Sequence, residues 1–541
     1  MVDRARDLSS SSLSPEVVPL QETPFLSRWD SALGHIVGIT LLVCGIGMLL
    51  SALVELLYGG GRSELLLTCG VLVTLLGGVL WRLTEAPQSL RRSTVYLTVA
   101  FCWFTCSIVG TLPYLLTGVL DNFFDALFES VSGFTTTGAT LFSTELFVSM
   151  TDSTDGSTLE PGLMFWRSIT QWFGGIGVVV LAVSVLPFLG VGGLDLLEAE
   201  APGPSSERLV PRLRDTARYL LWVYLSVTVM LVVLYLAGSM SVYDAIVHAF
   251  TTVSTGGFSP HLESMAYFDS PYIVWVCSFG MFLAGGSFAL YARAFSGSVP
   301  PLLRSAEFRA YVVFVLGATL SIVCLILINS DETLGGGLLR EALFTVLAFA
   351  TTTGYGLVDF LTWPEGPQAI LMFLLPVGAM AGSTAGGVKI IRVMSVVKYA
   401  RREVWRQLHP AVVQVVKIGK DPIPESVMRK IVGFVIFFVL LWFLGTLLVA
   451  ATGADFDTAL STAGSSIGNV GPGVADNVAG GDFTSVPWLG RLVLIALMLL
   501  GRLEIFPLLL ALRALADRSD LGAFLRRGKG IARSTSSARS R

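Results

Sequence analysis

Long apolar runs joined by short polar connections make up most of the chain after about residue 30. A helix needs roughly 20 apolar residues to cross a bilayer, and about ten of the runs reach that length. They lie near 31–58, 64–83, 94–117, 162–187, 216–238, 271–295, 308–329, 367–398, 427–451 and 487–515. Backbone groups in lipid must be hydrogen-bonded within the protein, and these lengths suit helices rather than barrel strands. The pattern predicts an all-α integral membrane protein with about ten transmembrane helices.

The first two runs form a predicted helix hairpin around Gly59-Gly60-Gly61, and the other eight form four pairs that each enclose a shorter amphipathic segment. These segments cover 122–134, 241–253, 337–350 and 455–468. At 1.5 Å per residue they are too short to span a membrane. Their starts align as FDALF, YDAIV, REALF and FDTAL, with a period near 110 residues. Such a period indicates repeats, so we expect four membrane–pore–membrane repeats with pseudo-fourfold symmetry around one pore.

A Thr- or Gly-rich turn follows each short segment. The four turns are Thr136-Thr137-Gly138-Ala139, Ser254-Thr255-Gly256-Gly257, Thr352-Thr353-Gly354-Tyr355 and Asn469-Val470-Gly471-Pro472. The last two continue into TTGYG and NVGPG, close variants of the TVGYG loop whose backbone carbonyls replace the water around a potassium ion. The negative end of each preceding helix dipole also favours a cation. The turns therefore predict one carbonyl-lined potassium filter. The side chains of Thr136, Ser254, Thr352 and Asn469 either add ion ligands or bond the local backbone.

A second unusual segment interrupts the eighth run. Four glycines within ten residues should break the helix expected over 368–399, because each disfavours helix by up to ~1 kcal/mol relative to Ala. The interrupted stretch contains Gly378, Gly382, Ser383, Thr384, Ala385, Gly386, Gly387 and Lys389. We expect a flexible gating loop across the pore below the filter, with close helix packing through small residues as the alternative.

Two arginines lie in apolar runs, where a charge is costly. Arg502 lies inside the last run, and its expected partners are carbonyls freed by the Gly-rich loop; a side chain reaching the membrane surface is the alternative. Arg167 lies near the start of the fourth run, closer to the interface than Arg502, and a structural role is favoured for it.

Composition and charge set the class and the orientation. The chain is 53% hydrophobic and only 14% charged, with mean hydropathy +0.72. Residues 118–160 and 453–490 carry acids, including Asp125 and Glu129, but no Lys or Arg, whereas the alternate connections and the tail are basic. The positive-inside rule then places the filter loops outside and both termini in the cytoplasm. The outer acids should concentrate cations at the mouth. All six cysteines lie in apolar runs, which argues against a disulfide framework.

With these motifs the chain resembles the Trk/Ktr/HKT superfamily of potassium transporters, and most closely the TrkH/TrkG branch of bacterial Trk systems. The stretches QWFGGIG (171–177), LGVGG (189–193), APGP (201–204) and GRLE (501–504) resemble that branch, and the match covers nearly the whole chain after about residue 28. The resemblance implies a homodimer regulated by cytoplasmic nucleotide-binding subunits of the TrkA type. It maps the filter glycines onto Gly138, Gly256, Gly354 and Gly471, a set that resembles the potassium-selective type. It also maps the gating loop onto 378–389 and its arginine partner onto Arg502. The first two turns lack the second filter-type Gly, which implies a less symmetric filter.

The expected organisation has seven parts: a disordered cytoplasmic N-terminus (1–28), the hairpin (29–90), repeats at 91–200, 201–300, 301–420 and 421–516, and a cytoplasmic tail (517–541). The predicted function is potassium uptake across the bacterial inner membrane, in contact with lipid and without nucleic acid, organic cofactor or enzymatic activity. No Walker or phosphorylatable Asp motif is present. Sodium permeation, symport with sodium or protons, and transport of an organic substrate remain alternatives. The parallel repeat disfavours the last of these, because organic-substrate transporters with broken helices usually carry inverted repeats.

Overall fold

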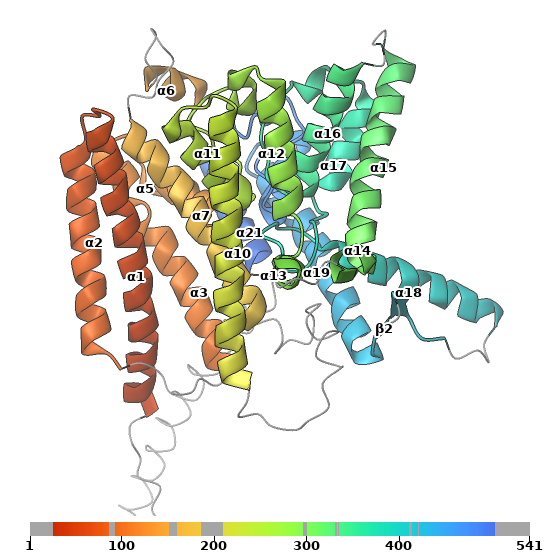
Figure 1. Cartoon of the computed structure of the whole chain (residues 1–541), viewed down its shortest axis with the longest axis horizontal. Coiled ribbons are helices and arrows are strands. Elements are labelled where there is room, and N and C mark those ends of the chain that lie inside the picture. The colour runs from red at the N-terminus through yellow and green to blue at the C-terminus, as the bar shows by residue number, and fades with distance from the viewer. Residues whose placement is uncertain are drawn as a thin grey trace, which may run out of the picture.

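The computed structural model describes residues 25–85, 92–150, 160–184, 209–295, 300–330, 333, 335–409, 414–419 and 421–503. Most of the predicted N-terminal segment, the stretches 189–193 and 201–204, Glu504 and the tail 517–541 therefore lie outside the described residues. The chain is a mostly helical protein in which long helices stand side by side (Figure 1). The mostly helical fold class is thereby confirmed, whereas the four repeats and the boundaries of the expected seven parts stay predictions.

The hairpin consists of α1 (Phe25–Leu57) and α2 (Ser63–Leu83), and it lies at one side of the bundle (Figure 1). Glycines on both helices allow the backbones to approach closely, as is common in membranes. A Cβ added at Gly77, for example, would lie 2.7 Å from the Leu42 amide nitrogen. The carboxylate of Glu55, which is fully buried, accepts a hydrogen bond from the Gly162 amide at 2.6 Å. This contact fastens the hairpin to the start of α7.

The remaining helices follow the predicted order of four groups. The first group contains α3 (Arg92–Val109), α4 (Leu112–Thr117), α5 (Phe123–Phe134), α6 (Thr144–Ser149) and α7 (Pro161–Ser184). The second contains α10 (Leu209–Ala237), α11 (Val242–Val253), the 3-10 helix η2 (Ser264–Phe268), α12 (Pro271–Ala284) and α13 (Phe288–Phe295). The third contains α14 (Pro300–Arg304), α15 (Ala306–Asn329), α16 (Gly336–Ala350), η3 (Phe360–Thr362), α17 (Glu365–Leu374) and α18 (Ile390–Leu408), and the fourth contains α19 (Glu425–Ala450), α20 (Phe456–Gly468) and α21 (Trp488–Arg502). The four predicted short segments are α5, α11, α16 and α20, each correct to within one residue at both ends.

Six helical stretches in the described part of the chain are long and apolar enough to cross a membrane, and a bent pair raises the number to seven. The expected total of about ten stays a prediction. One reason for the difference is that α17 ends after ten residues at the Gly-rich break, as predicted.

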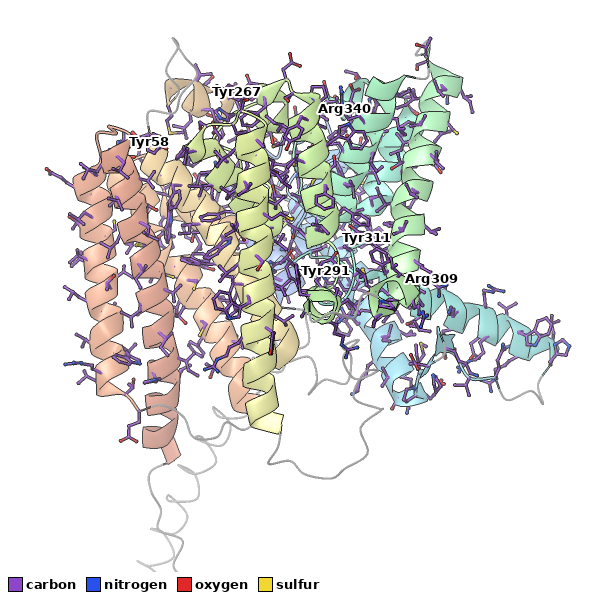
Figure 2. All side chains as sticks on the ribbon, viewed as in Figure 1. Tyr58, Tyr267, Tyr291, Arg309, Tyr311 and Arg340 are labelled. Atoms are coloured by element: carbon purple, nitrogen blue, oxygen red, sulfur yellow. The ribbon has the colours of Figure 1, made fainter. Side chains whose placement is uncertain are left out.

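The bent pair is a second break that the sequence pattern did not predict. Helices α12 and α13 meet at 98° around Gly285 and Gly286. Added Cβ atoms at these two glycines would lie 2.5 Å from the Tyr311 hydroxyl and 1.8 Å from the Tyr291 hydroxyl, respectively. Figure 2 shows Tyr291, which belongs to α13, and Tyr311 of α15 near this bend. The two rings occupy the space that side chains at the break would need.

Helix α18 follows the Gly-rich break and projects sideways from the bundle, at the end opposite to α6 (Figure 1). A two-residue hairpin, β1 (Lys417–Ile418) paired with β2 (Asp421–Pro422), connects it to α19 and is the small exception to the all-α prediction. Arg402 of α18 binds Glu425 of α19 at 2.9 Å, which joins the two helices. It also binds the neighbouring Glu403 at 2.8 Å. The hydrogen bond from Arg402 lowers the pKa of the Glu403 carboxyl.

Candidate ion-conduction site

The four short helices end in turns with the same backbone conformation. Each turn has a non-glycine residue in the left-handed region, at φ of 54–56°, followed two residues later by a glycine at φ of 75–104°. The non-glycine residues are Thr136, Thr255, Thr352 and Asn469, and the glycines are Gly138, Gly257, Gly354 and Gly471. Left-handed backbone is unfavourable for most side chains, so its recurrence at four equivalent places shows that the turns share one geometry.

This geometry corrects the register of the second turn. Ser254 is the cap residue of α11, as Thr135 is of α5 and Thr351 is of α16. The glycine equivalent to Gly138 is therefore Gly257 and not Gly256, and Phe258 takes the place of Tyr355 or Pro472. The pattern was misleading because Ser-Thr-Gly-Gly offers two consecutive glycines, and only the backbone angles identify the left-handed one.

The turns are arranged as a closed ring. A Cβ added at Gly138 would lie 2.1 Å from the Gly256 carbonyl oxygen, and one at Gly257 would lie 1.9 Å from the Thr353 oxygen. A Cβ at Gly354 would lie 2.1 Å from the Val470 oxygen, and one at Gly471 would lie 2.8 Å from the Thr137 oxygen. Each glycine therefore contacts a carbonyl of the next turn, and the fourth turn contacts the first. The ring oxygens of Thr137, Gly256, Thr353 and Val470 come from equivalent positions.

The side chains on the inner side of the ring differ among the repeats. Thr352 Oγ1 accepts a hydrogen bond from the Gly386 amide at 2.8 Å, and Asn469 Nδ2 donates to Thr137 Oγ1 at 3.0 Å. Ser254 and Thr255 bond the local backbone through their hydroxyl groups. In the described part of the chain, the buried Thr136 Oγ1 and Asn469 Oδ1 have no hydrogen-bond partner. Asn469 Oδ1 lies beside Gly386 and Gly501, against the Gly-rich loop and α21.

The Gly-rich loop packs directly against the turns. Thr384 Oγ1 donates to the Val253 carbonyl at 3.0 Å, and a Cβ added at Gly386 would lie 2.2 Å from the Gly468 carbonyl oxygen. The break contains two left-handed glycines, Gly382 and Gly387. Another added Cβ, at Gly378, would lie 2.0 Å from the Gly386 oxygen, so the two ends of the loop touch.

Two cations hold this loop. Arg502 is buried and donates from Nη1 to the Thr384 carbonyl at 2.8 Å, which confirms the predicted contact between this arginine and the loop. Lys389, also buried, donates to the Ala385 carbonyl and to Ser383 Oγ. Carbonyls that a regular helix would have paired are therefore bound by side chains.

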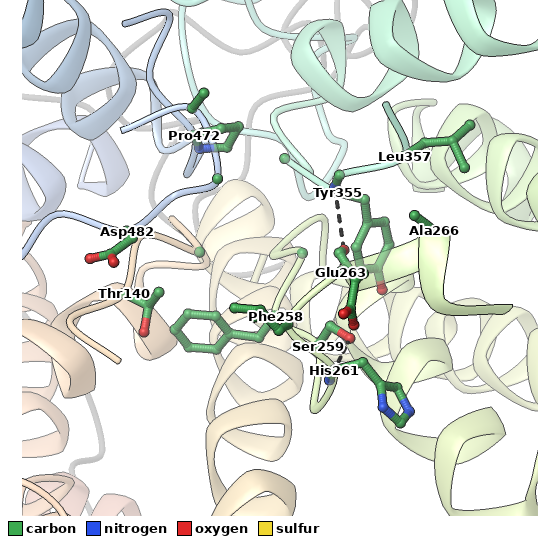
Figure 3. Close-up of a pocket in the computed structure, with 18 of the residues that line it drawn as sticks. Thr140, Phe258, Ser259, His261, Glu263, Ala266, Tyr355, Leu357, Pro472 and Asp482 are labelled. Carbon is green, nitrogen blue, oxygen red and sulfur yellow. Dashed lines mark hydrogen bonds between the residues drawn. The ribbon is translucent and has the colours of Figure 1, made fainter. Parts of the chain in front are cut away.

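On the opposite side, the turns open into a cavity of about 400 Å³. Figure 3 shows Phe258, Tyr355 and Pro472, from three different turns, around it. Its lining includes the carboxylates of Glu263, Asp359 and Asp482. Acids therefore line this cavity, and Asp482 belongs to the acidic stretch 453–490 identified from the sequence, whereas Asp125 and Glu129 are not part of the lining.

Asp125 and Glu129 are both paired with arginines instead. Asp125 binds Arg491 at 2.7 Å, and the fully buried Glu129 binds Arg167 at 2.8 Å. Arg167 is itself 2% exposed, so its side chain is buried in this ion pair and does not extend to the membrane interface.

Sequence reasoning also missed the role of Gln171. Its Nε2 donates to the Gly256 carbonyl at 2.8 Å, and its Oε1 accepts from the Phe258 amide at 3.1 Å. One side chain of α7 thus holds the second turn at two points. Its position at the start of the QWFGGIG stretch was the available signal.

Comparison with known proteins identifies the family of the chain. The family model described as "TrkH: Cation transport protein" matches residues 66–520. The chain is 37% identical over 478 residues to the Trk system potassium uptake protein TrkH of Halomonas elongata, which covers 87% of this chain and 96% of the relative. It is 30% identical over 480 residues to the Trk system potassium uptake protein TrkG of Escherichia coli, covering 88% and 96% of the two chains.

The fold matches that of a solved structure. The crystal structure of the potassium transporter TrkH from Vibrio parahaemolyticus superposes with a TM-score of 0.80 at 32% identity, covering 89% of this chain and 98% of that chain. The apolar helices and the fold define a multi-span membrane transport protein. The chain belongs to the TrkH family of cation transport proteins, which are transporters and not enzymes.

Proposed function

We propose that this protein takes up potassium across the bacterial inner membrane through the ring of turn carbonyls. The ring of four equivalent oxygens is the observation that carries the proposal, because such rings replace the hydration shell of a potassium ion. The relatives are named as potassium uptake proteins, and the acid-lined cavity would attract cations to the mouth. The potassium ion is cargo here, held by backbone oxygens of the four turns.

The Gly-rich loop is the proposed gate. It lies against the ends of α11 and α20 through Thr384 and Gly386, and Arg502 holds it there. Loss of these contacts would let the loop move away from the ring. The left-handed Gly382 and Gly387 supply backbone freedom for such a movement.

The resemblance to the family supports a proposal about assembly and regulation. We propose a homodimer in which each protomer has its own pore, with a TrkA-like nucleotide-binding subunit at the cytoplasmic side. Both chain termini and α18 are proposed to face the cytoplasm, with the turns toward the outside. Arg309 and Arg340 lie near opposite ends of α15 (Figure 2). The basic connections provide the support for this orientation.

Sodium permeation is the second candidate function, and it is favoured by the differences in sequence among the four turns. Only the third and fourth turns have glycine two places after the left-handed glycine, at Gly356 and Gly473. The first and second have Thr140 and Ser259 there. Coupling of flux to protons or sodium is compatible with either reading.

Flux measurements with the purified protein in liposomes test the proposal. Uptake of potassium, rubidium, sodium and lithium would be compared for the wild-type protein and for a deletion of residues 382–387. We expect potassium and rubidium uptake well above that of sodium and lithium, with a further rise in the deletion variant. Equal sodium uptake would support the sodium-permeable alternative, and absence of ion flux from both proteins would contradict the proposal.

A further inference from the structure

The ion pair between Glu129 and Arg167 lies directly behind the outer end of the first turn. Glu129 belongs to α5, and Arg167 belongs to α7. Both side chains are almost fully buried, and Arg167 Nε donates to Glu129 Oε1 at 2.8 Å. A charge pair in this environment has lost its hydration, so each partner depends on the other and on nearby polar groups.

Those polar groups belong to the first turn and its continuation. Thr140 Oγ1 lies 3.1 Å from both carboxylate oxygens of Glu129 and 3.0 Å from Arg167 Nη2. The Leu141 amide donates to Glu129 Oε2 at 3.0 Å. Thr140 is two residues after Gly138, so the pair fixes the chain immediately outside the carbonyl ring.

The same arginine reaches the second turn. Its guanidinium lies 4.1 Å from the centre of the Phe258 ring, and Nη1 donates to the Ser259 carbonyl at 3.4 Å. Phe258 directly follows the left-handed Gly257 of the ring. Figure 3 shows Thr140 and Phe258 at the edge of the mouth cavity.

The connection extends to the fourth repeat through the backbone of Thr140. Its amide donates to the Gly481 carbonyl at 2.8 Å, and its carbonyl accepts from the Phe483 amide at 2.9 Å. One ion pair is therefore linked to the outer sides of three of the four turns.

We propose that Glu129 and Arg167 are positioning residues. They would set the spacing of the backbone carbonyls at the outer ends of the turns and thereby the preference among monovalent cations. The proposal rests on the proposed function of the carbonyl ring. Stability alone is a weak explanation for the pair, because well-packed apolar residues often replace a buried ion pair without loss of stability. The hydrogen bonds to the turn are what an apolar replacement would not reproduce.

The test separates positioning from folding. Thr140→Val keeps the ion pair and nearly the same volume but removes the hydroxyl link, whereas the double variant Glu129→Leu with Arg167→Met removes both charges together. The matched control is Arg491→Gln, which breaks the ion pair to Asp125, four residues before Glu129 on the same helix. Initial rates of potassium and sodium uptake into liposomes and the thermal unfolding temperature would be measured for each protein.

We expect the potassium-to-sodium ratio to fall at least about tenfold in Thr140→Val and in the double variant, because a hydrogen bond to a charged group corresponds to at least roughly that factor in an equilibrium. The control should keep the wild-type ratio, and the uptake of each variant is compared at a temperature at which its unfolding scan shows it folded. If the double variant does not fold, Thr140→Val decides. A selective wild-type protein with an unchanged ratio in Thr140→Val would overturn this inference alone. A wild-type protein without potassium preference would instead overturn the proposed function beneath it.

Discussion

Replacing Gly257 with alanine tests the carbonyl ring most directly. The residue has φ of +75°, and a Cβ there would lie 1.9 Å from the Thr353 carbonyl oxygen. Contacts shorter than 3.0 Å are essentially never seen for real Cβ atoms, so the separation must grow by 3.0 − 1.9 = 1.1 Å. The left-handed backbone adds roughly 1–2 kcal/mol for any residue with a side chain. The variant therefore combines backbone strain with displacement of one ring oxygen.

Gly118→Ala separates these two effects. Gly118 has φ of +69°, with no atom within 4 Å of the added Cβ, and it lies after α4, away from the turns. Both variants share the backbone cost, but only Gly257→Ala moves the ring. We expect Gly118→Ala to take up potassium with the wild-type KM, and Gly257→Ala to lose about tenfold in the potassium-to-sodium ratio, the equivalent of ~1.4 kcal/mol.

The assay would measure initial potassium and sodium uptake into liposomes across a range of ion concentrations, with a thermal unfolding scan of each protein. If Gly257→Ala is as stable as Gly118→Ala and keeps both the wild-type KM and the wild-type ratio, the ring oxygens do not set selectivity.

Three further substitutions have defined outcomes. Gln171→Leu removes both contacts to the second turn and leaves a buried amide unpaired, at a cost of about 1–3 kcal/mol; we expect a lower potassium-to-sodium uptake ratio, and an unchanged ratio would show that this clamp is dispensable. Glu55→Ala unpairs the Gly162 amide and should lower the thermal unfolding temperature by a few degrees without changing the KM for potassium; a changed KM in a protein of unchanged stability would contradict that assignment. Thr352→Val removes the acceptor for the Gly386 amide and should raise potassium flux severalfold in protein without its regulatory partner, whereas wild-type flux would indicate that this contact does not hold the loop closed.

Features with a strong local signature were predictable from the sequence. The four short helices were found because an amphipathic segment too short to span repeats at a regular interval, and the break after α17 was found because glycines cluster there. The contact between Arg502 and the loop was predictable because a buried charge requires hydrogen-bond acceptors and a broken helix leaves carbonyls without helical partners.

The remaining features depend on partners distant in sequence. Glu129 looked like one of several acids in an outer connection because its partner, Arg167, is 38 positions away on another helix. The register of the second turn depends on which of two adjacent glycines adopts a left-handed φ, and composition cannot distinguish them. The bend between α12 and α13 was missed because two adjacent glycines are a weak helix-breaking signal, and the tyrosines that fill the bend come partly from another helix.

The hydrogen bond between the Gly386 amide and Thr352 Oγ1 has a thermodynamic consequence. Thr352 begins the third turn, so this bond links the Gly-rich loop to the proposed ion path. Suppose that the bond exists only when the loop is closed. An ion that stabilises the bonded arrangement of Thr352 then favours the closed loop, and closing the loop strengthens ion binding by the same free energy, because coupling between two sites is reciprocal. A net contribution of ~1 kcal/mol would correspond to about a fivefold change in either equilibrium. An ion bound beside Thr352 and a protein bound to the loop would then be linked ligands, because the binding of each would change the affinity for the other.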